Sequence, residues 1–102
     1  VRGEGIVPVS YSLNQNFPNP FNPATTITYR LGRPSSVTIT VYDLLGQQLG
    51  VLVNEKQREG YYAVEFTGND LPSGAYFYTL QAYDYDNIDL YFEEARKMIL
   101  VK

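Results

Sequence analysis

The sequence contains no cysteine and no histidine among its 102 residues. Without cysteine there is neither a disulfide framework nor a thiolate metal site. The two absences also remove the strongest common nucleophile and the commonest general base, and no pair of carboxylates lies in a segment that predicts a cleft. The sequence therefore predicts a protein that is not an enzyme and that has no catalytic residue, no metal and no cofactor.

Positive charge and long apolar runs are also scarce. Eight Lys and Arg stand against eleven Asp and Glu, which gives a net charge of −3. A mildly acidic domain lacks the basic stripe that neutralises phosphates, so neither nucleic acid nor an anionic membrane surface is an expected partner. No apolar run approaches the ~20 residues that a membrane-spanning helix requires. We expect no nucleic-acid partner and no membrane insertion.

The residues that are abundant favour strands. Ten tyrosines bring the aromatic fraction to 15%, and aromatic side chains suit the half-buried surface of a sheet. No long window shows apolar residues at helical spacing. The length corresponds to one domain. Because the chain starts at Val1 rather than Met, we interpret residues 1–9 as a linker remnant from an upstream domain and residues 10–102 as the folded unit.

Alternating apolar and polar residues predict a series of short strands separated by turns. The expected strands are residues 25–31, 36–43, 48–53, 61–67, 75–83 and 90–102, the last with an interruption around 93–96. Between them we expect a turn in which Gly46 takes a positive φ, a charged loop at 54–60 and an acidic loop at 84–89. The apolar positions of the alternation form the predicted core: Ile27, Tyr29, Val37, Ile39, Val41, Val64, Phe66, Tyr76, Tyr78 and Leu80. This pattern favours an all-β sandwich over a barrel.

A proline-rich segment precedes the first of these strands. Its three prolines, Pro18, Pro20 and Pro23, hold the chain extended but make it a poor central strand. We expect Phe17 and Phe21 to anchor the segment onto the core. Its role is then either a recognition epitope or a lead-in that protects a sheet edge, and the two roles are compatible.

Four motifs resemble one known family, the type A C-terminal sorting domain of the type IX (Por) secretion system. They cover about nine-tenths of the chain, from Leu13 onward, and their order and spacing fit. The motifs are Leu13-x-Gln15-Asn16-x-Pro18-Asn19-Pro20-Phe21-Asn22-Pro23-x-Thr25-x-Ile27-x-Tyr29-x-Leu31, Val37-x-Ile39-x-Val41-Tyr42-Asp43-x-x-Gly46, Leu71-x-x-Gly74-x-Tyr76-x-Tyr78-x-Leu80 and Lys97-Met98-Ile99-Leu100-Val101-Lys102. One departure is a longer connection before the final strand, residues 82–96.

The resemblance implies a fold and a function. The expected fold is an immunoglobulin-like antiparallel β-sandwich of about seven strands. The expected function is a non-catalytic C-terminal sorting signal that follows a cargo domain in the same chain. The implied partners are the outer-membrane secretion machinery and a sortase-like peptidase. The implied destination is the cell surface or the medium, reached through the periplasm of a Gram-negative bacterium.

We expect the partner to recognise two kinds of segment. The final strand has four apolar residues between two lysines, and we expect its edge to be uncovered and therefore suited to strand addition by a partner. The proline motif is a further candidate epitope. The Gly-x-Tyr motif is included as well, although its simplest interpretation is structural, with Gly74 ending a turn and Tyr76 beginning the core-facing positions. The predicted recognition residues are Pro18, Asn19, Pro20, Phe21, Gly74, Tyr76, Lys97, Met98, Ile99, Leu100, Val101 and Lys102.

Two other functions compete with sorting. The first is a carbohydrate-binding module of a secreted glycoside hydrolase, with Tyr62, Tyr76, Tyr78, Tyr83, Tyr85 and Tyr91 as a stacking platform; the simpler interpretation places these rings in the core or over strand surfaces. The second is an inert spacer similar to a fibronectin type III domain. The carboxylates of residues 84–89, with Glu93 or Glu94, are candidate Ca²⁺ ligands. Their spacing lacks the glycine and the distal glutamate of an EF-hand, so we predict a solvated loop.

Overall fold

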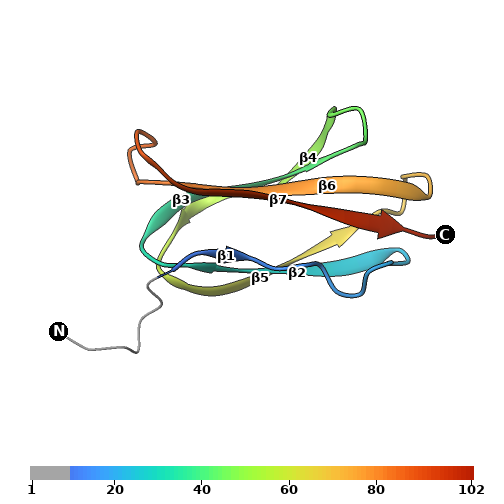
Figure 1. The fold of residues 1–102 in the computed structure, drawn as a ribbon, viewed down its shortest axis with the longest axis horizontal. Coiled ribbons are helices and arrows are strands. Elements are labelled where there is room, and N and C mark those ends of the chain that lie inside the picture. Colours follow the sequence, from blue (N-terminus) through green and yellow to red (C-terminus); the bar gives the residue numbers. More distant parts are fainter. Residues whose placement is uncertain (1–9) are drawn as a thin grey trace.

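The computed structural model describes residues 10–102, so the predicted linker at 1–9 lies outside the described residues. The described part of the chain has seven strands and no helix, hence no helix able to cross a membrane. The strands are β1 (Ser12–Leu13), β2 (Ala24–Leu31), β3 (Ser35–Tyr42), β4 (Gln48–Gln57), β5 (Gly60–Thr67), β6 (Gly74–Tyr83) and β7 (Leu90–Leu100). Figure 1 shows them running nearly parallel to the long axis of the molecule.

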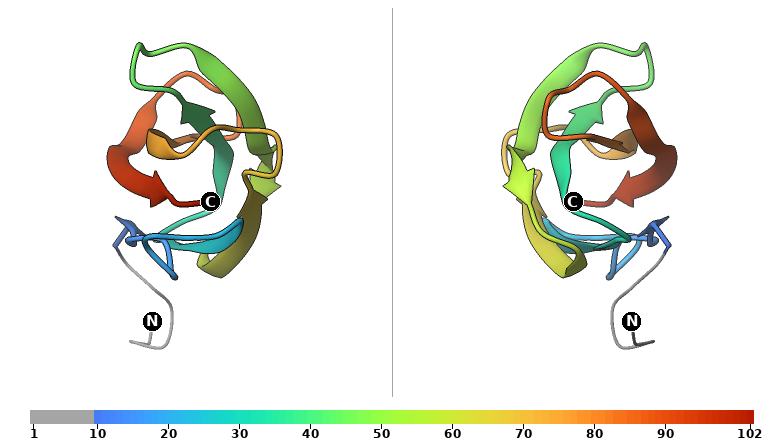
Figure 2. Two further views of the ribbon diagram at one scale, coloured as in Figure 1. Left: turned by 90° about the vertical axis from the view of Figure 1, so that its right-hand side faces the viewer. Right: turned by 90° about the vertical axis from the view of Figure 1, so that its left-hand side faces the viewer.

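The strands form two antiparallel sheets that face each other. One sheet has the order β1-β2-β5 and the other has the order β4-β3-β6-β7. The two layers are separate in Figure 1, and the end-on views of Figure 2 show how the four-stranded sheet curves over the three-stranded one. The predicted all-β sandwich is therefore confirmed.

The core lies between the sheets at the positions that the alternation marked. Of the ten predicted core residues, eight are at most 5% exposed. The other two, Val64 and Phe66, are half-buried and pack against this core. Both belong to β5, which is the last strand of its sheet and so has a neighbour on only one side. The prediction that alternate residues point inward is confirmed, because the side-chain period of a strand is two.

The charged loop predicted at residues 54–60 is wrong, because β4 continues to Gln57 and only Arg58 and Glu59 remain as a turn. Residues 54–57 pair in register with residues 35–38 of β3. β4 is the outer strand of its sheet. Its polar side chains therefore reach water while its backbone stays in the sheet, so the charges that suggested a loop are compatible with a strand.

The interruption predicted around residues 93–96 is also wrong, because β7 runs unbroken from Leu90 to Leu100. Glu94 and Arg96 stand opposite the buried residues Leu80 and Tyr78, on the core side of the sheet. They form an ion pair at 3.0 Å, and Arg96 Nε donates to the carbonyl of Leu13 at 2.9 Å. Inward charges are tolerated here because β7 is an edge strand whose long side chains reach polar partners.

The turn at Gly46 and the acidic loop before β7 both connect neighbouring antiparallel strands. Gly46 has φ +85°, as expected for the turn between β3 and β4. The connection predicted at residues 82–96 is shorter than expected. Only Asp84–Asp89 lie outside the strands, because the flanking residues belong to β6 and β7. Within this loop the amide of Ile88 donates to Asp84 Oδ1 at 2.8 Å.

A candidate recognition surface at one end of the sandwich

The proline-rich segment lies along the outer edge of β7. We call residues 15–23 the strap. Phe21 pairs with Leu100 in a parallel bridge, in which its amide donates to the Ile99 carbonyl at 2.9 Å and its carbonyl accepts from the Val101 amide at 2.9 Å. Two strap side chains extend this pairing: Gln15 Nε2 donates to the Lys97 carbonyl at 2.7 Å, and Asn19 Oδ1 accepts from the Ile99 amide at 3.0 Å.

The strap therefore covers the edge that we expected to be open. Four backbone groups of residues 97–101 already have partners, and two of those partners are amide side chains that replace the backbone of a neighbouring strand. The prediction of an uncovered terminal edge is wrong for this part of β7. The sequence did not reveal the cover because the strap and the terminal strand are about 80 residues apart, as the sequence separations of the two side-chain bonds show.

The two phenylalanines of the strap have opposite environments. Phe21 is 1% exposed and meets Phe66 edge-on, with ring centroids 6.0 Å apart. Phe17 is 79% exposed, so the expectation that it anchors the strap is wrong. A residue that sequence reasoning missed takes that place: Asn16 is 2% exposed and its amide donates to the Pro18 carbonyl and to Thr25 Oγ1.

The end of the chain is held at the same place. The Lys102 amide donates to Ser73 Oγ at 2.9 Å, and Lys102 Nζ donates to the Asn69 carbonyl. In the β6–β7 register Gly74 stands opposite Leu100 and Tyr76 opposite Met98. The strap, the start of β6 and the end of β7 are thus neighbours, near the C-terminus in Figure 1.

The structure divides the predicted recognition residues into two groups. Those exposed to solvent are Pro18, Asn19, Pro20, Gly74, Lys97, Val101 and Lys102, with Ile99 half-buried. Those in the core are Phe21, Tyr76, Met98 and Leu100. The buried members contact the interior and position the exposed members. The sequence alone did not separate these two roles.

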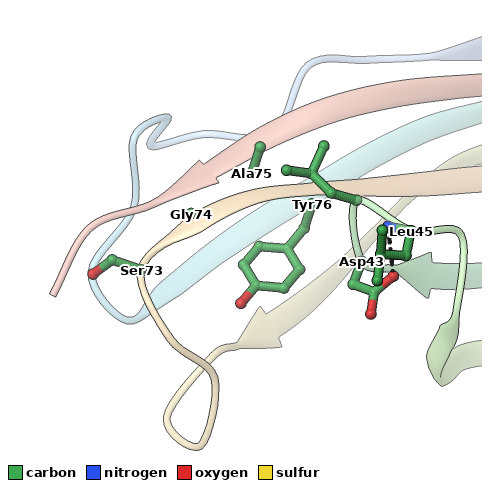
Figure 3. A pocket seen from close by; sticks show the side chains of 7 residues that line it. Asp43, Leu45, Ser73, Gly74, Ala75 and Tyr76 are labelled. Atoms are coloured by element: carbon green, nitrogen blue, oxygen red, sulfur yellow. Dashed lines mark hydrogen bonds between the residues drawn. The ribbon is translucent and has the colours of Figure 1, made fainter.

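A shallow hollow of about 220 Å³ lies beside this end, between the β3–β4 turn and the start of β6 (Figure 3). Leu44 and Leu45 line it and are 64% and 86% exposed. The turn is closed by Asp43, whose Oδ1 accepts from the amides of Leu45 and Gln47, both at 2.9 Å. Sequence reasoning treated this turn only as a connection.

Burial controls the ionisation of the tyrosines in the interior. Burial raises the pKa of both Tyr29 and Tyr78 to about 12. The Tyr78 hydroxyl donates to the Asn14 carbonyl at 2.7 Å, and the Tyr29 hydroxyl donates to Gln57 Oε1 at 2.8 Å. These hydroxyls are neutral hydrogen-bond donors that connect segments distant in the sequence. They supply no acid or base near neutral pH.

The tyrosines proposed as a sugar platform do not form one exposed surface. Tyr76 and Tyr78 are buried. The Tyr91 ring lies under the Arg33 guanidinium at 4.2 Å, and the Tyr85 ring under the Lys56 ammonium at 5.4 Å. Across residues 10–102, moreover, no three His, Cys, Asp or Glu side chains meet where they could hold a metal ion.

Residues 15–89 match the family described as the secretion system C-terminal sorting domain. The chain belongs to this family. It is a C-terminal sorting domain of type IX secretion, a signal that sends its carrier to the cell surface or the medium. Domains of this family are in general not catalytic.

The solved structures that resemble the sorting domain include two proteins. One is the crystal structure of dimeric latent PorU from Porphyromonas gingivalis, with 21% identity and a TM-score of 0.65 over 98% of this chain. The sorting domain spans 10% of that PorU chain. The other is CopC from Methylosinus trichosporium OB3b, with 14% identity and a TM-score of 0.55, covering 89% of this chain and 93% of CopC. At these identities the likeness concerns the fold alone. A search of curated proteins found no match.

Proposed function

We propose that this sorting domain guides a cargo protein, joined ahead of it in the same polypeptide, from the periplasm of a Gram-negative bacterium across the outer membrane. The proposed partner is the outer-membrane secretion machinery, and a sortase-like peptidase then cuts between cargo and domain. The observation that carries the proposal is the convergence of distant motifs. The strap, the Gly74–Tyr76 segment and the terminal residues are separate in sequence but adjacent at one end of the sandwich.

We propose that the partner reads this end as one composite surface and does not add a strand to residues 97–101. Strand addition needs free backbone donors and acceptors. Here the outward groups of Lys97, Ile99 and Val101 are already bonded to the strap. A competing strand would have to break four hydrogen bonds before it formed its own. Contact with the exposed side chains of the strap and the terminal strand has no such cost.

The charges at this end suggest the chemistry of the partner. Lys97 and Lys102 are both exposed, in a chain whose net charge is −3. Local positive charge on an acidic domain favours a partner with acidic side chains and steers their encounter. Exposed charges add little to the stability of the fold, and the one side-chain contact of Lys102, with the Asn69 carbonyl, is itself exposed. Replacing these lysines is therefore a suitable test of recognition.

The experiment uses a reporter fused ahead of the complete 102-residue chain, in a bacterium that has the type IX machinery. Wild type is expected on the cell surface or in the medium, and in the periplasm when the machinery is deleted. Lys97→Ala combined with Lys102→Ala should lower export several-fold. Lys56→Ala is the matched control, because Lys56 is also exposed but belongs to β4.

Three results decide between recognition and stability. Surface changes of this kind rarely shift stability by more than ~0.5 kcal/mol, so melting curves of the variants should overlay. Export of the wild-type fusion at an equal rate without the machinery would refute the proposed function. Equal export of the double lysine variant and the control would refute the role of the lysines. Deletion of residues 97–102 is a poor substitute, because Met98 and Leu100 are buried.

A further inference from the structure

Phe17 is a large apolar side chain held in an unusual position. Its amide donates to the Thr26 carbonyl and its carbonyl accepts from the Thr26 amide, both at 2.9 Å. Thr26 lies between the buried residues Thr25 and Ile27 and therefore points away from the core. Residues opposed in an antiparallel bridge share one face of a sheet. The Phe17 ring is thus displayed on the outer face of the three-stranded sheet, 79% exposed.

The backbone that carries this ring is held by a closed network of hydrogen bonds. The buried Asn16 amide donates to the Pro18 carbonyl at 3.1 Å and to Thr25 Oγ1 at 3.0 Å. Thr25 Oγ1 in turn donates to the Pro18 carbonyl at 2.8 Å. Pro18 adds a fixed φ directly after Phe17. A ring on such a scaffold has only two side-chain torsions to restrict when it binds, so little conformational entropy is lost.

Other exposed aromatic rings of the domain already have partners, whereas Phe17 has none among the described residues. The Arg30 guanidinium lies 5.8 Å from the centroid of the Tyr61 ring, and the Lys56 ammonium lies over the Tyr85 ring at 5.4 Å. In the part of the chain that the structure describes, Phe17 takes part in no aromatic pair and no cation–π contact. Its ring is free for an intermolecular contact.

We propose that Phe17 is the anchor of the recognition surface and inserts into an apolar pocket of the outer-membrane partner. This inference rests on the proposed function. Phe17 belongs to the strap, whose Gln15 side-chain amide bonds the Lys97 carbonyl, so the ring is displayed from the segment that borders the terminal strand. Aromatic residues that enter a pocket at the centre of an interface dominate binding, and their truncation weakens it by about 30-fold or more. The partner therefore presents an apolar pocket, with acidic groups placed to meet Lys97.

The test measures export of the reporter fusion for three single variants of the complete chain. Phe17→Ala removes the anchor, and Phe17→Leu keeps an apolar side chain of smaller size. The matched control is Ile88→Ala, because Ile88 is 75% exposed, lies in the β6–β7 loop and also has its amide bonded to a neighbour. That loop lies at the opposite end of the sandwich from the C-terminus (Figure 1). At limiting expression we expect export to fall about 30-fold for Phe17→Ala, less for Phe17→Leu, and not at all for Ile88→Ala.

The outcomes separate this inference from the proposed function. If wild type needs the type IX machinery but Phe17→Ala is exported at the wild-type rate, the inference is wrong and the proposed function stands. If wild type reaches the surface without the machinery, the proposed function itself fails. Equal losses for Phe17→Ala and Ile88→Ala would also overturn the inference. If Phe17→Ala lowers the melting temperature, export is compared instead between Phe17→Leu and a fourth variant, Phe17→Asn, once the two are shown to have equal melting temperatures. Higher export of Phe17→Leu than of Phe17→Asn supports an apolar pocket in the partner. Equal export of these two variants overturns the inference.

Discussion

The strap makes a strong prediction about Phe21, the residue that fixes it to the core. Phe21→Ala removes a ring that is 1% exposed, that packs edge-on against Phe66 and that approaches Gly68. Changes of this kind cost ~3–5 kcal/mol through lost burial and the cavity left behind. A domain of this size has ~5–15 kcal/mol of stability in total. We therefore expect a folded but much less stable protein.

The loss should be concentrated at the edge of β7. The amides of Ile99 and Val101 donate to Asn19 Oδ1 and to the Phe21 carbonyl, which belong to the strap. When Phe21→Ala removes the buried ring that fixes the strap, these two amides should exchange with solvent faster than the amides between β3 and β6, which pair with other strands. Urea unfolding measures the total loss, and amide hydrogen exchange measures where it occurs.

The control is Phe17→Ala, which removes an identical ring from the same strap where the ring is exposed. It should change the free energy of unfolding by no more than ~0.5 kcal/mol. A loss below ~0.5 kcal/mol for Phe21→Ala would refute the anchoring role. Uniform acceleration of exchange across both sheets would refute the idea that the strap specifically protects the terminal edge.

Three further predictions test other parts of the fold. Ile39→Ala should cost ~2–5 kcal/mol in urea unfolding, because Ile39 is fully buried; a cost under ~0.5 kcal/mol would place it at the surface. The free energy of unfolding should fall between pH 10 and pH 12, because Tyr29 and Tyr78 have pKa values of about 12 in the folded protein and 10.0 in the unfolded chain. Folding thus favours the protonated forms of both tyrosines, and this stabilisation is complete below pH 10. Urea unfolding of a Tyr78→Phe variant should show a smaller loss of stability at alkaline pH than wild type. An identical loss would contradict this linkage. Isothermal titration should detect no tight Ca²⁺ binding at residues 84–89; sub-micromolar binding that Asp86→Ala abolishes would contradict this prediction.

Local periodicity determined most of the fold. The inward positions of β2, β3 and β6 follow from alternation, because each of these strands has a neighbour on both sides and its two faces meet different environments. The same reasoning failed at β4 and at residues 93–96 of β7. Both are edge strands, where polar side chains reach water or a partner without leaving the sheet. Charge at these positions therefore did not indicate a loop.

The recognition surface could be predicted only in part. Its motifs were visible as residue patterns, and their match to a family of sorting domains was correct. The opposite environments of Phe17 and Phe21, the burial of Asn16 and the cover over β7 were not visible. Each depends on contacts between residues that are far apart in the chain or on which face of a strand meets the second sheet.

The sequence by itself determined that this protein is a small β-sandwich of a secretion family with no histidine or cysteine for catalysis. The tertiary structure decided which motif residues face outward and which hold them in place. The physical reason is that alternation along a strand is a local property. The pairing of Gln15 and Asn19 with the edge formed by Lys97 and Ile99 exists only after the chain has folded back on itself.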